Sequence, residues 1–193
     1  MRSDKQDKIV SFDNELLILV DDQDREIGYD SKFNCHRGKG ILHRAFSIFI
    51  FNDQGQILMQ KRSAQKKLWP LFWSNSCCSH PRKAEKLADA TLRRLEEELG
   101  IQTDLKFIFK FQYQSPYLQL GSENEFCSVY IGKSNGPVRT NPNEIEDFRF
   151  ISVEDLDRMI RDNPDQLTPW FKMEWERMRN EYWEDIVHYL NRN

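Results

Sequence analysis

The 193-residue sequence has no apolar run near the roughly 20 residues that a membrane-spanning helix needs. Its first residues, MRSDKQDK, lack the apolar stretch of a signal peptide. Cysteine is scarce, with four residues of which Cys77 and Cys78 are adjacent, and this pattern does not fit a secreted disulfide framework. The sequence therefore predicts a cytoplasmic protein with reduced thiols and no membrane association.

An excess of charge of one sign is also absent. The 28 lysines and arginines are balanced by 31 aspartates and glutamates, a net charge of −3 that argues against nucleic-acid binding. Hydrophobic residues make up 39% of the chain, which excludes a disordered protein. We expect a flexible N-terminus at residues 1–13 and a single domain at residues 14–193. The sequence leaves the oligomeric state open, with a monomer favoured.

Apolar periodicity and turn residues predict the secondary structure. The pattern predicts helices over 85–99, 153–162 and about 168–190, the first with a stripe of Ala88, Leu92, Leu95 and Leu99 before Gly100. It predicts strands over 15–21, 44–51, 56–62, 105–113, 123–131 and 145–151. We therefore expect a sheet with helices on its faces.

The histidines and one pair of glutamates give the first chemical signal. Three of the four histidines, His36, His43 and His80, lie outside the clear helices. Glu123 and Glu125 stand two apart in a strand-like segment, so their carboxylates point to the same face. Three imidazoles and two carboxylates would suit Mn²⁺, Fe²⁺ or Zn²⁺. On spacing alone, satisfied polar histidines and a solvated strand edge remain alternatives.

Two further segments carry candidate chemistry. Within WPLFWSNSCCSH, a thiol beside a ligand histidine can exchange protons near neutrality, which we favour for Cys78, whereas Cys77 is typical of a small buried hydrophobe. In the helix over 85–99, three consecutive acids follow Leu95. A solvated face explains Glu96, and an ordinary i,i+4 ion pair is the plain interpretation of Arg94 and Glu98.

The same helix resembles the Nudix box. The pattern is Ser79-x5-Glu85-x7-Arg93-Arg94-Leu95-x-Glu97-Glu98-x-Gly100-Ile101. Ser79 replaces the usual leading glycine, and Arg94 replaces a glutamate with which Nudix hydrolases gather divalent metal. This exchange turns a metal-binding position into an anion-binding one, which favours holding a diphosphate over cleaving it.

A narrower resemblance covers about residues 30 to 180. The HRAFS segment after His36, the stretch KRSAQKKLWPLFWSNSCCSHP, the altered box, the ENE at 123–125 and TPWFKMEW together resemble the type I isopentenyl-diphosphate delta-isomerase family. The resemblance implies an α+β fold, a Nudix-like mixed β-sheet sandwiched between α-helices in a single domain. It also implies an isomerase of isoprenoid biosynthesis that interconverts isopentenyl and dimethylallyl diphosphate through a tertiary carbocation.

The resemblance also implies roles for individual residues. Catalytic roles fall to Cys78, Glu125, Tyr113 and Trp175, with Trp175 facing the developing cation. Diphosphate binding falls to Lys32, Arg62, Lys66, Ser79 and Arg94. A Mn²⁺ or Zn²⁺ type of ion is implied at His36, His43, His80, Glu123 and Glu125. Mg²⁺ is implied at Glu98 and the Cys78 backbone carbonyl, where it bridges to the small-molecule diphosphate substrate.

The chemistry of this reaction suits these residue types. Protonating an alkene gives a carbocation that water would quench, so the site needs an acid, a base and a dry pocket. The first alternative is a Nudix hydrolase of nucleoside diphosphate derivatives, for which Glu97 and Glu98 remain available. The second is a metal-stabilised binding module, which the absence of CxxC and HxxxH spacings disfavours.

Overall fold

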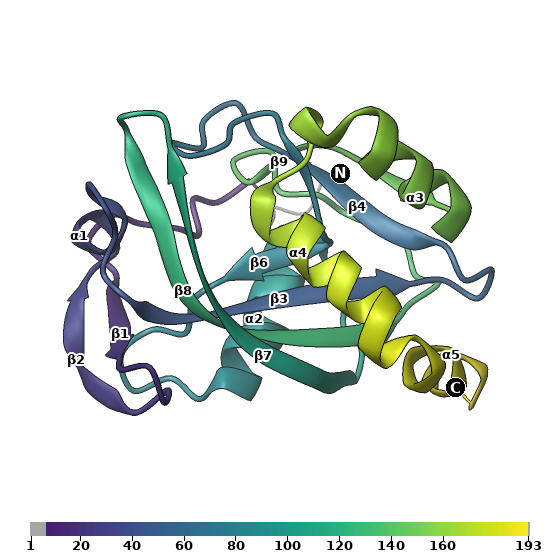
Figure 1. Ribbon diagram of the computed structural model, residues 1–193, viewed down its shortest axis with the longest axis horizontal. Helices are drawn as coiled ribbons and strands as arrows, with labels where there is room; N and C mark the ends of the chain where they lie inside the picture. The colour runs from purple at the N-terminus through teal and green to yellow at the C-terminus, as the bar shows by residue number, and fades with distance from the viewer. Residues whose placement is uncertain (1–6, 193) are drawn as a thin grey trace.

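Nine strands of residues 7–192, the part of the chain that this computed structural model describes, form one mixed sheet (Figure 1). The strands are β1 (Leu16–Val20), β2 (Glu26–Ser31), β3 (His43–Phe51), β4 (Ile57–Arg62), β5 (Trp73–Ser74), β6 (Cys77–Ser79), β7 (Leu105–Tyr117), β8 (Gly121–Lys133) and β9 (Ile145–Ile151). The helices are α1 (Lys32–His36), α2 (Leu87–Leu99), α3 (Val153–Asp162), the 3-10 turn η1 (Pro164–Gln166), α4 (Pro169–Arg177), the π-helical turn η2 (Met178–Tyr182) and α5 (Trp183–Arg192). The main strand order is β2-β1-β3-β4-β5, with β6 and β8 also on β3, β7 on β8 and β9 on β4.

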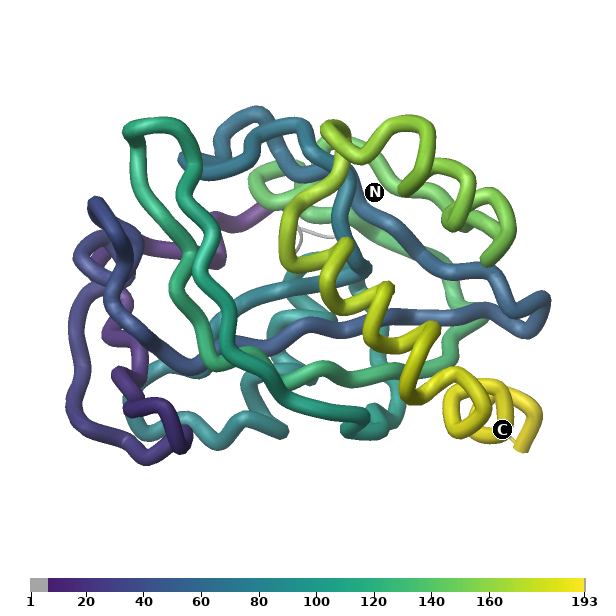
Figure 2. Tube along the Cα trace, viewed as in Figure 1, coloured from purple at the N-terminus to yellow at the C-terminus, as the bar shows by residue number. Residues whose placement is uncertain are grey.

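Strand β3 organises the sheet because its sequence, HRAFSIFIF, is apolar on both faces. Phe46 and Ile48 enter the core that α2 closes with Leu95, while Phe49 and Phe51 enter the core beneath α3–α5. Figure 2 shows the C-terminal part of the chain, green to yellow, on the near side of the sheet. The helices therefore sandwich the sheet, which confirms the predicted fold class.

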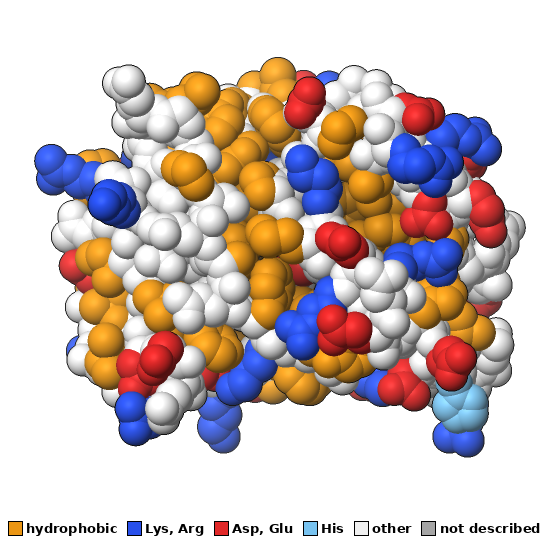
Figure 3. All heavy atoms as spheres, viewed as in Figure 1, with side chains coloured by type: hydrophobic (Ala, Val, Ile, Leu, Met, Phe, Trp, Pro, Cys, Tyr) orange, Lys and Arg blue, Asp and Glu red, His pale blue; other side chains and the backbone are white. Residues whose placement is uncertain are grey.

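The outer surface of α3–α5 is rich in charged side chains of both signs (Figure 3). In residues 7–192, no helix is long and apolar enough to cross a membrane. Apolar area in this layer is instead buried toward the sheet, where Phe171 and Met178 are fully covered.

Strand pairing brings distant residues to one end of β8. Parallel pairing aligns His43 of β3 with Glu125, and the antiparallel β7–β8 hairpin aligns Tyr113 with the same residue. Gly121 begins β8 beside α1, and a Cβ atom there would clash with the carbonyl oxygen of His36. Only glycine permits this close approach, which sets Glu123 next to His36.

The predicted elements agree with most of the structure. The strand over 145–151 and the helix over 153–162 are confirmed at both ends. Strand β7 extends four residues beyond the predicted end at Tyr113. The prediction stopped there because the segment that follows is polar and lacks an apolar alternation. The helix predicted over 168–190 is interrupted by η2.

The structure also contains short elements that the sequence pattern missed, namely β2, α1, β5 and β6. β5 and β6 have only two and three residues, and β2 and α1 are short and largely without apolar periodicity, so none of them carries a periodic signal. Residues 1–6 of the predicted flexible N-terminus lie outside the described residues. Asp7 and Lys8 accept hydrogen bonds through their carbonyl oxygens from Asn143 and Asn141, so this part of the chain lies against the domain.

Candidate active site and metal centre

Five side chains with metal-binding groups converge at one end of β8. His36 ends α1, His43 begins β3, His80 follows β6, and Glu123 and Glu125 come from β8 itself. One ligand atom from each residue lies within 4.8 Å of all the others. His36 Nε2 is 2.8 Å from Glu123 Oε2, and His80 Nε2 is 2.8 Å from Glu125 Oε1. The structure thus brings together every residue that the sequence assigned to this site.

The ring nitrogens show that a cation fits. Nδ1 of His36 is 2.7 Å from the carbonyl oxygen of Lys32, and Nδ1 of His43 is 2.7 Å from that of Ile41. Because a carbonyl only accepts, each Nδ1 donates, and each Nε2 is therefore the ring nitrogen that is available to the cluster. His43 Nε2 is buried without a hydrogen-bond partner. Burial, followed by the charge of His36, lowers the pKa of His43 to about 3, so its ring is neutral.

A buried lone pair aimed at carboxylates is unfavourable unless a cation lies between them. Three imidazole nitrogens and two carboxylates are also ligands that first-row divalent metals accept. The residues present therefore fit a divalent metal ion.

The two glutamates differ in their proton affinity. Glu125 Oε2 accepts a hydrogen bond from Tyr113 Oη at 2.6 Å. Burial and then the negative charge of Glu123 raise the pKa of Glu125 well above its usual range. Burial also opposes ionisation of Glu123, but the charge and hydrogen bond of His36 outweigh it and lower that pKa to about 2. Only one of the two carboxyl groups is ionised until further positive charge joins them.

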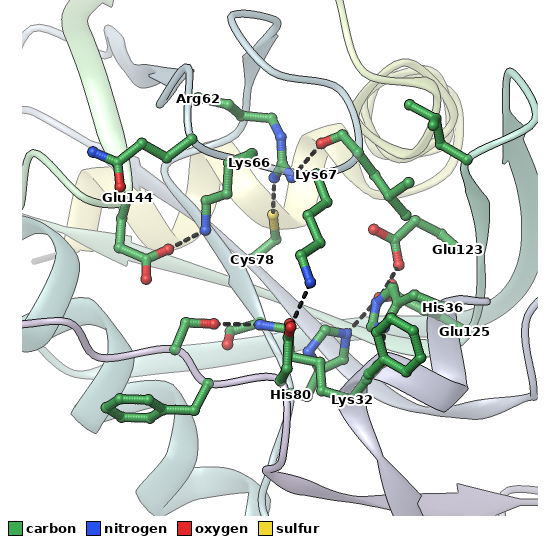
Figure 4. Close-up of a pocket in the computed structure, with 18 of the residues that line it drawn as sticks. Lys32, His36, Arg62, Lys66, Lys67, Cys78, His80, Glu123, Glu125 and Glu144 are labelled. Carbon is green, nitrogen blue, oxygen red and sulfur yellow. Dashed lines mark hydrogen bonds and ion pairs between the residues drawn. The ribbon is translucent and has the colours of Figure 1, made fainter.

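The thiol of Cys78 lies beside the guanidinium group of Arg62, which backbone carbonyl groups hold in place. Arg62 donates to the carbonyl oxygens of Leu68 and Trp69 at 2.9 and 3.0 Å, and its Nη1 is 3.9 Å from Cys78 Sγ. Figure 4 shows the sulfur pointing toward this guanidinium. Burial raises the pKa of Cys78 to about 12 despite the opposing charge of Arg62. The thiol therefore keeps its proton at neutral pH.

Basic side chains crowd the other side of the site. Burial, followed by the charges of Lys66 and Arg94, lowers the pKa of Lys32 to about 8. Lys66 forms an ion pair with Glu144, and Arg94 Nη2 is 3.3 Å from Glu144 Oε2. Burial disfavours the Glu144 carboxylate, but these two cations outweigh it and lower its pKa to about 2. Among the groups on this side that line the cavity, the three cations outnumber the Glu144 carboxylate, which suits a bound anion; the other carboxylates that pair with Arg94 lie outside the lining.

A cavity of about 670 Å³ joins these groups. In the view of Figure 4, Cys78 lies between the Lys66–Glu144 pair and the histidine–glutamate cluster. The predicted site residues that line the cavity are Lys32, His36, Arg62, Lys66, Cys78, Ser79, His80, Arg94, Tyr113, Glu123 and Glu125. His43 lies beneath it, fully buried.

Trp175, by contrast, is not among the residues that line the cavity. Its Nε1 donates to Asp157 Oδ1 of α3 at 2.7 Å, and its ring meets the edge of Trp183. The tryptophan that lines the cavity is Trp170, with its ring centroid 5.2 Å from the Arg62 guanidinium carbon and 6.3 Å from the ring of Tyr113. Five residues along a helix correspond to a rotation of about 140°, so the two side chains cannot share a direction.

Glu98 is also outside the cavity lining. Its Oε1 is 2.5 Å from Arg94 Nη2, and its exposed fraction is 2%. The i,i+4 ion pair that the spacing allowed is therefore present. The negative charge of Glu98 still raises the pKa of Cys78, although the Glu98 carboxylate lies outside the cavity lining.

Among the contributors to the cavity wall that sequence reasoning missed are Glu144, Trp170 and the N-terminal segment with Ile9 and Phe12. Trp170 follows Pro169 in the first turn of a helix, which would have marked it as fixed in place. Neither Glu144 nor the N-terminal segment carries a motif that separates it from ordinary surface residues.

Comparison with known proteins agrees with this geometry. The NUDIX domain family matches residues 41–171, more than half of the chain. The MutT protein from Methanosarcina mazei Go1 aligns with a TM-score of 0.61 and 18% identity, over 72% of this chain and 94% of its own. The chain is therefore a Nudix-fold protein.

Curated relatives narrow this class. Isopentenyl-diphosphate Delta-isomerase 1 from Photorhabdus laumondii is 40% identical over 174 residues, which are 89% of this chain and 99% of the relative. Isopentenyl-diphosphate delta-isomerase from Schizosaccharomyces pombe is 33% identical over 196 residues, covering 90% of this chain and 86% of the relative. The chain belongs to the isopentenyl-diphosphate delta-isomerase family within the Nudix superfamily, which confirms the predicted resemblance.

Proposed function

We propose that this chain interconverts isopentenyl diphosphate and dimethylallyl diphosphate in isoprenoid biosynthesis, with Cys78 and Glu125 as the two proton-handling residues. The observation that supports it is one cavity lined by both a protonated thiol and a carboxyl group, with a surplus of cations at its side. A hydrolase of nucleoside diphosphates would leave the thiol and the histidine–glutamate cluster without a shared purpose.

Several of the residues that line the cavity have a part in this reaction. Lys32, Lys66 and Arg94 bind the diphosphate, assisted by Arg62 and the Ser79 hydroxyl, and so hold the short hydrocarbon tail toward Cys78 and Glu125. One of these two groups gives a proton to the terminal carbon of the alkene, which leaves the tertiary carbon as a cation. The other group removes a proton from the methylene that is bonded to this cationic carbon. Tyr113 orients Glu125 through its hydrogen bond. The net charge of substrate and product is the same.

The carbocation between the two proton transfers needs protection from water. The indole of Trp170 lines the cavity and takes the part that the family resemblance implied for Trp175. Its π face can stabilise a desolvated cation by about 2 kcal/mol. Positioned proton transfer supplies much of the remaining rate enhancement.

Two divalent ions complete the proposal. His36, His43, His80, Glu123 and Glu125 would hold a Mn²⁺ or Zn²⁺ type of ion. Glu98 with the Cys78 carbonyl would hold Mg²⁺ only if the Glu98 carboxylate, which lies outside the cavity lining, leaves its ion pair with Arg94. When bound, the first ion supplies charge that orients and acidifies Glu125, and Mg²⁺ neutralises the diphosphate.

An isomerase assay tests the proposal directly. Purified chain with isopentenyl diphosphate and Mg²⁺ should form dimethylallyl diphosphate, and in D₂O both product and recovered substrate should gain deuterium. Release of phosphate or pyrophosphate without a new prenyl diphosphate would instead support the hydrolase.

A further inference from the structure

Glu174 is a fully buried carboxyl group that the reaction above does not use. It lies on α4, where its Oε1 accepts a weak hydrogen bond from Cys127 Sγ at 3.6 Å, and the same Sγ is 3.6 Å from Ser47 Oγ. Its Oε2 is buried without a hydrogen-bond partner. A buried carboxylate with one weak neutral donor and an unpaired oxygen is costly, whereas a neutral carboxyl group is tolerated.

Cys127, and through it Ser47, connects Glu174 to the strands that carry the reacting groups. Ser47 lies on β3, directly opposite Cys78 of β6 in the strand register. Cys127 lies on β8, two residues beyond Glu125 and therefore on the same face of the sheet. Negative charge on Glu174 also raises the pKa of both Cys78 and Glu125, so its field reaches both residues.

Glu174 is also linked to the cavity through its own helix. Trp170 precedes it by four residues, so the two side chains leave the same face of α4. A bond from Glu174 to the sheet therefore fixes the direction and depth of the indole that lines the cavity.

We propose that Glu174, as a neutral carboxyl group, is a positioning residue of the isomerase site that joins α4 to β3 and β8 and so holds Trp170 over Cys78 and Glu125. This role rests on the proposed function. Ionisation would strengthen the hydrogen bond that Glu174 accepts, but it would leave a buried charge without a cation and add negative charge beside the two proton-handling groups.

The pH range of this change follows from the burial of the group. Burial raises the pKa of Glu174 to about 8, although the polar side chains of Ser47 and Cys127 oppose it. The titratable and charged groups that the packed elements bring to this side are Cys78 of β6, Arg62 of β4, Tyr113 of β7, and Glu125 and Cys127 of β8. The thiols and the phenol have pKa values raised well above 8 or to about 12, so they do not ionise in the same range.

The experiment compares kcat and KM from pH 6 to 9.5 for the metal-loaded wild-type chain, Glu174→Gln and Glu174→Ala. The exposed Glu176→Gln on the same helix is the control. Glu174→Ala should lower kcat roughly tenfold, or about 1.4 kcal/mol in barrier, with a smaller change in KM. Glu174→Gln, which is neutral at every pH, should rescue kcat and reduce the loss of kcat that the wild type shows above about pH 8. Deprotonation of Lys32, whose pKa is also about 8, should persist in this variant as a rise in KM.

A second measurement does not depend on turnover. The carboxyl pKa is raised on folding from 4.5 to about 8, so its stabilisation is complete below pH 4.5 and is lost as the pH rises toward 8. Glu174→Gln should remove this part of the decline in unfolding free energy, and Glu176→Gln should not. This arm also decides the case if Glu174→Ala fails to fold.

An active wild-type chain whose alkaline loss of kcat persists unchanged in Glu174→Gln would overturn the role of Glu174 alone. Equal kcat values for Glu174→Ala and the wild type would do the same. A wild-type chain without isomerase activity would instead refute the proposed function, and the unfolding measurement would then still report whether Glu174 is neutral in the folded protein.

Discussion

Replacing Trp170 with leucine separates two possible tasks of its indole ring. The ring lines the cavity, and it also lies 5.2 Å from the guanidinium carbon of Arg62. If it stabilises the carbocation, Trp170→Leu should lower kcat, whereas if it only supports Arg62 in diphosphate binding, the variant should raise KM. We expect the loss mainly in kcat.

The size of this loss follows from the cation–π energy. A desolvated contact of about 2 kcal/mol corresponds to a decrease of about 30-fold in kcat. Leucine keeps an apolar side chain in the wall, and the Trp170 Nε1 has no hydrogen-bond partner to lose. The variant should therefore fold. Trp170→Phe, which has a weaker π face than tryptophan, should have a kcat between those of the wild type and Trp170→Leu.

Trp175→Leu is the matched control. It removes the hydrogen bond to Asp157 and should cost about 1 kcal/mol of unfolding free energy from that bond, in addition to lost packing, with little change in kcat. Steady-state kinetics and thermal unfolding of the three variants measure both effects. A larger loss of kcat in Trp175→Leu than in Trp170→Leu would refute the placement of the indole.

The other predictions concern the reacting groups, the metal and pH. Cys78→Ala should lower kcat at least roughly 10²-fold, whereas Cys77→Ala should keep it within a factor of about two; equal rates would contradict proton transfer by the thiol. Glu125→Gln should abolish turnover while Glu96→Gln, on the solvated helix face, stays active. Chelation should erase activity and lower the melting temperature, since the buried His43 Nε2 then has no partner; an unchanged melting temperature would count against the metal site. The pKa of Glu144 is lowered to about 2, so its stabilisation is present above pH 4.5 and lost as the pH falls toward 2; Glu144→Gln should flatten that part of an acid unfolding curve.

The long periodic elements could be predicted from the sequence because their signal is local. The apolar stripe of α2 ends at Gly100, which adopts the left-handed conformation of a helix cap. The short elements carry no such signal. The strand β6 has three residues, yet its pairing with β3 determines where Cys78 points.

The kinds of side chain that meet at the site could also be predicted from the sequence. The residue types at 36, 43, 80, 123 and 125 indicate a metal centre, and Arg94 in place of a glutamate favours anion binding. Motif order was sufficient for the family, because the markers keep their order along most of the chain.

The sequence by itself determined the fold class and the family, since the motifs that carry them depend on residue type and local spacing. Only the tertiary structure decided which tryptophan lines the cavity, that Glu144 pairs with Lys66 and Arg94, and that Glu174 is buried beside Cys127. The physical reason is that a side chain's direction and its electrostatic partners depend on the rotation of a helix and on contacts between segments far apart in the chain. No local pattern encodes either of them.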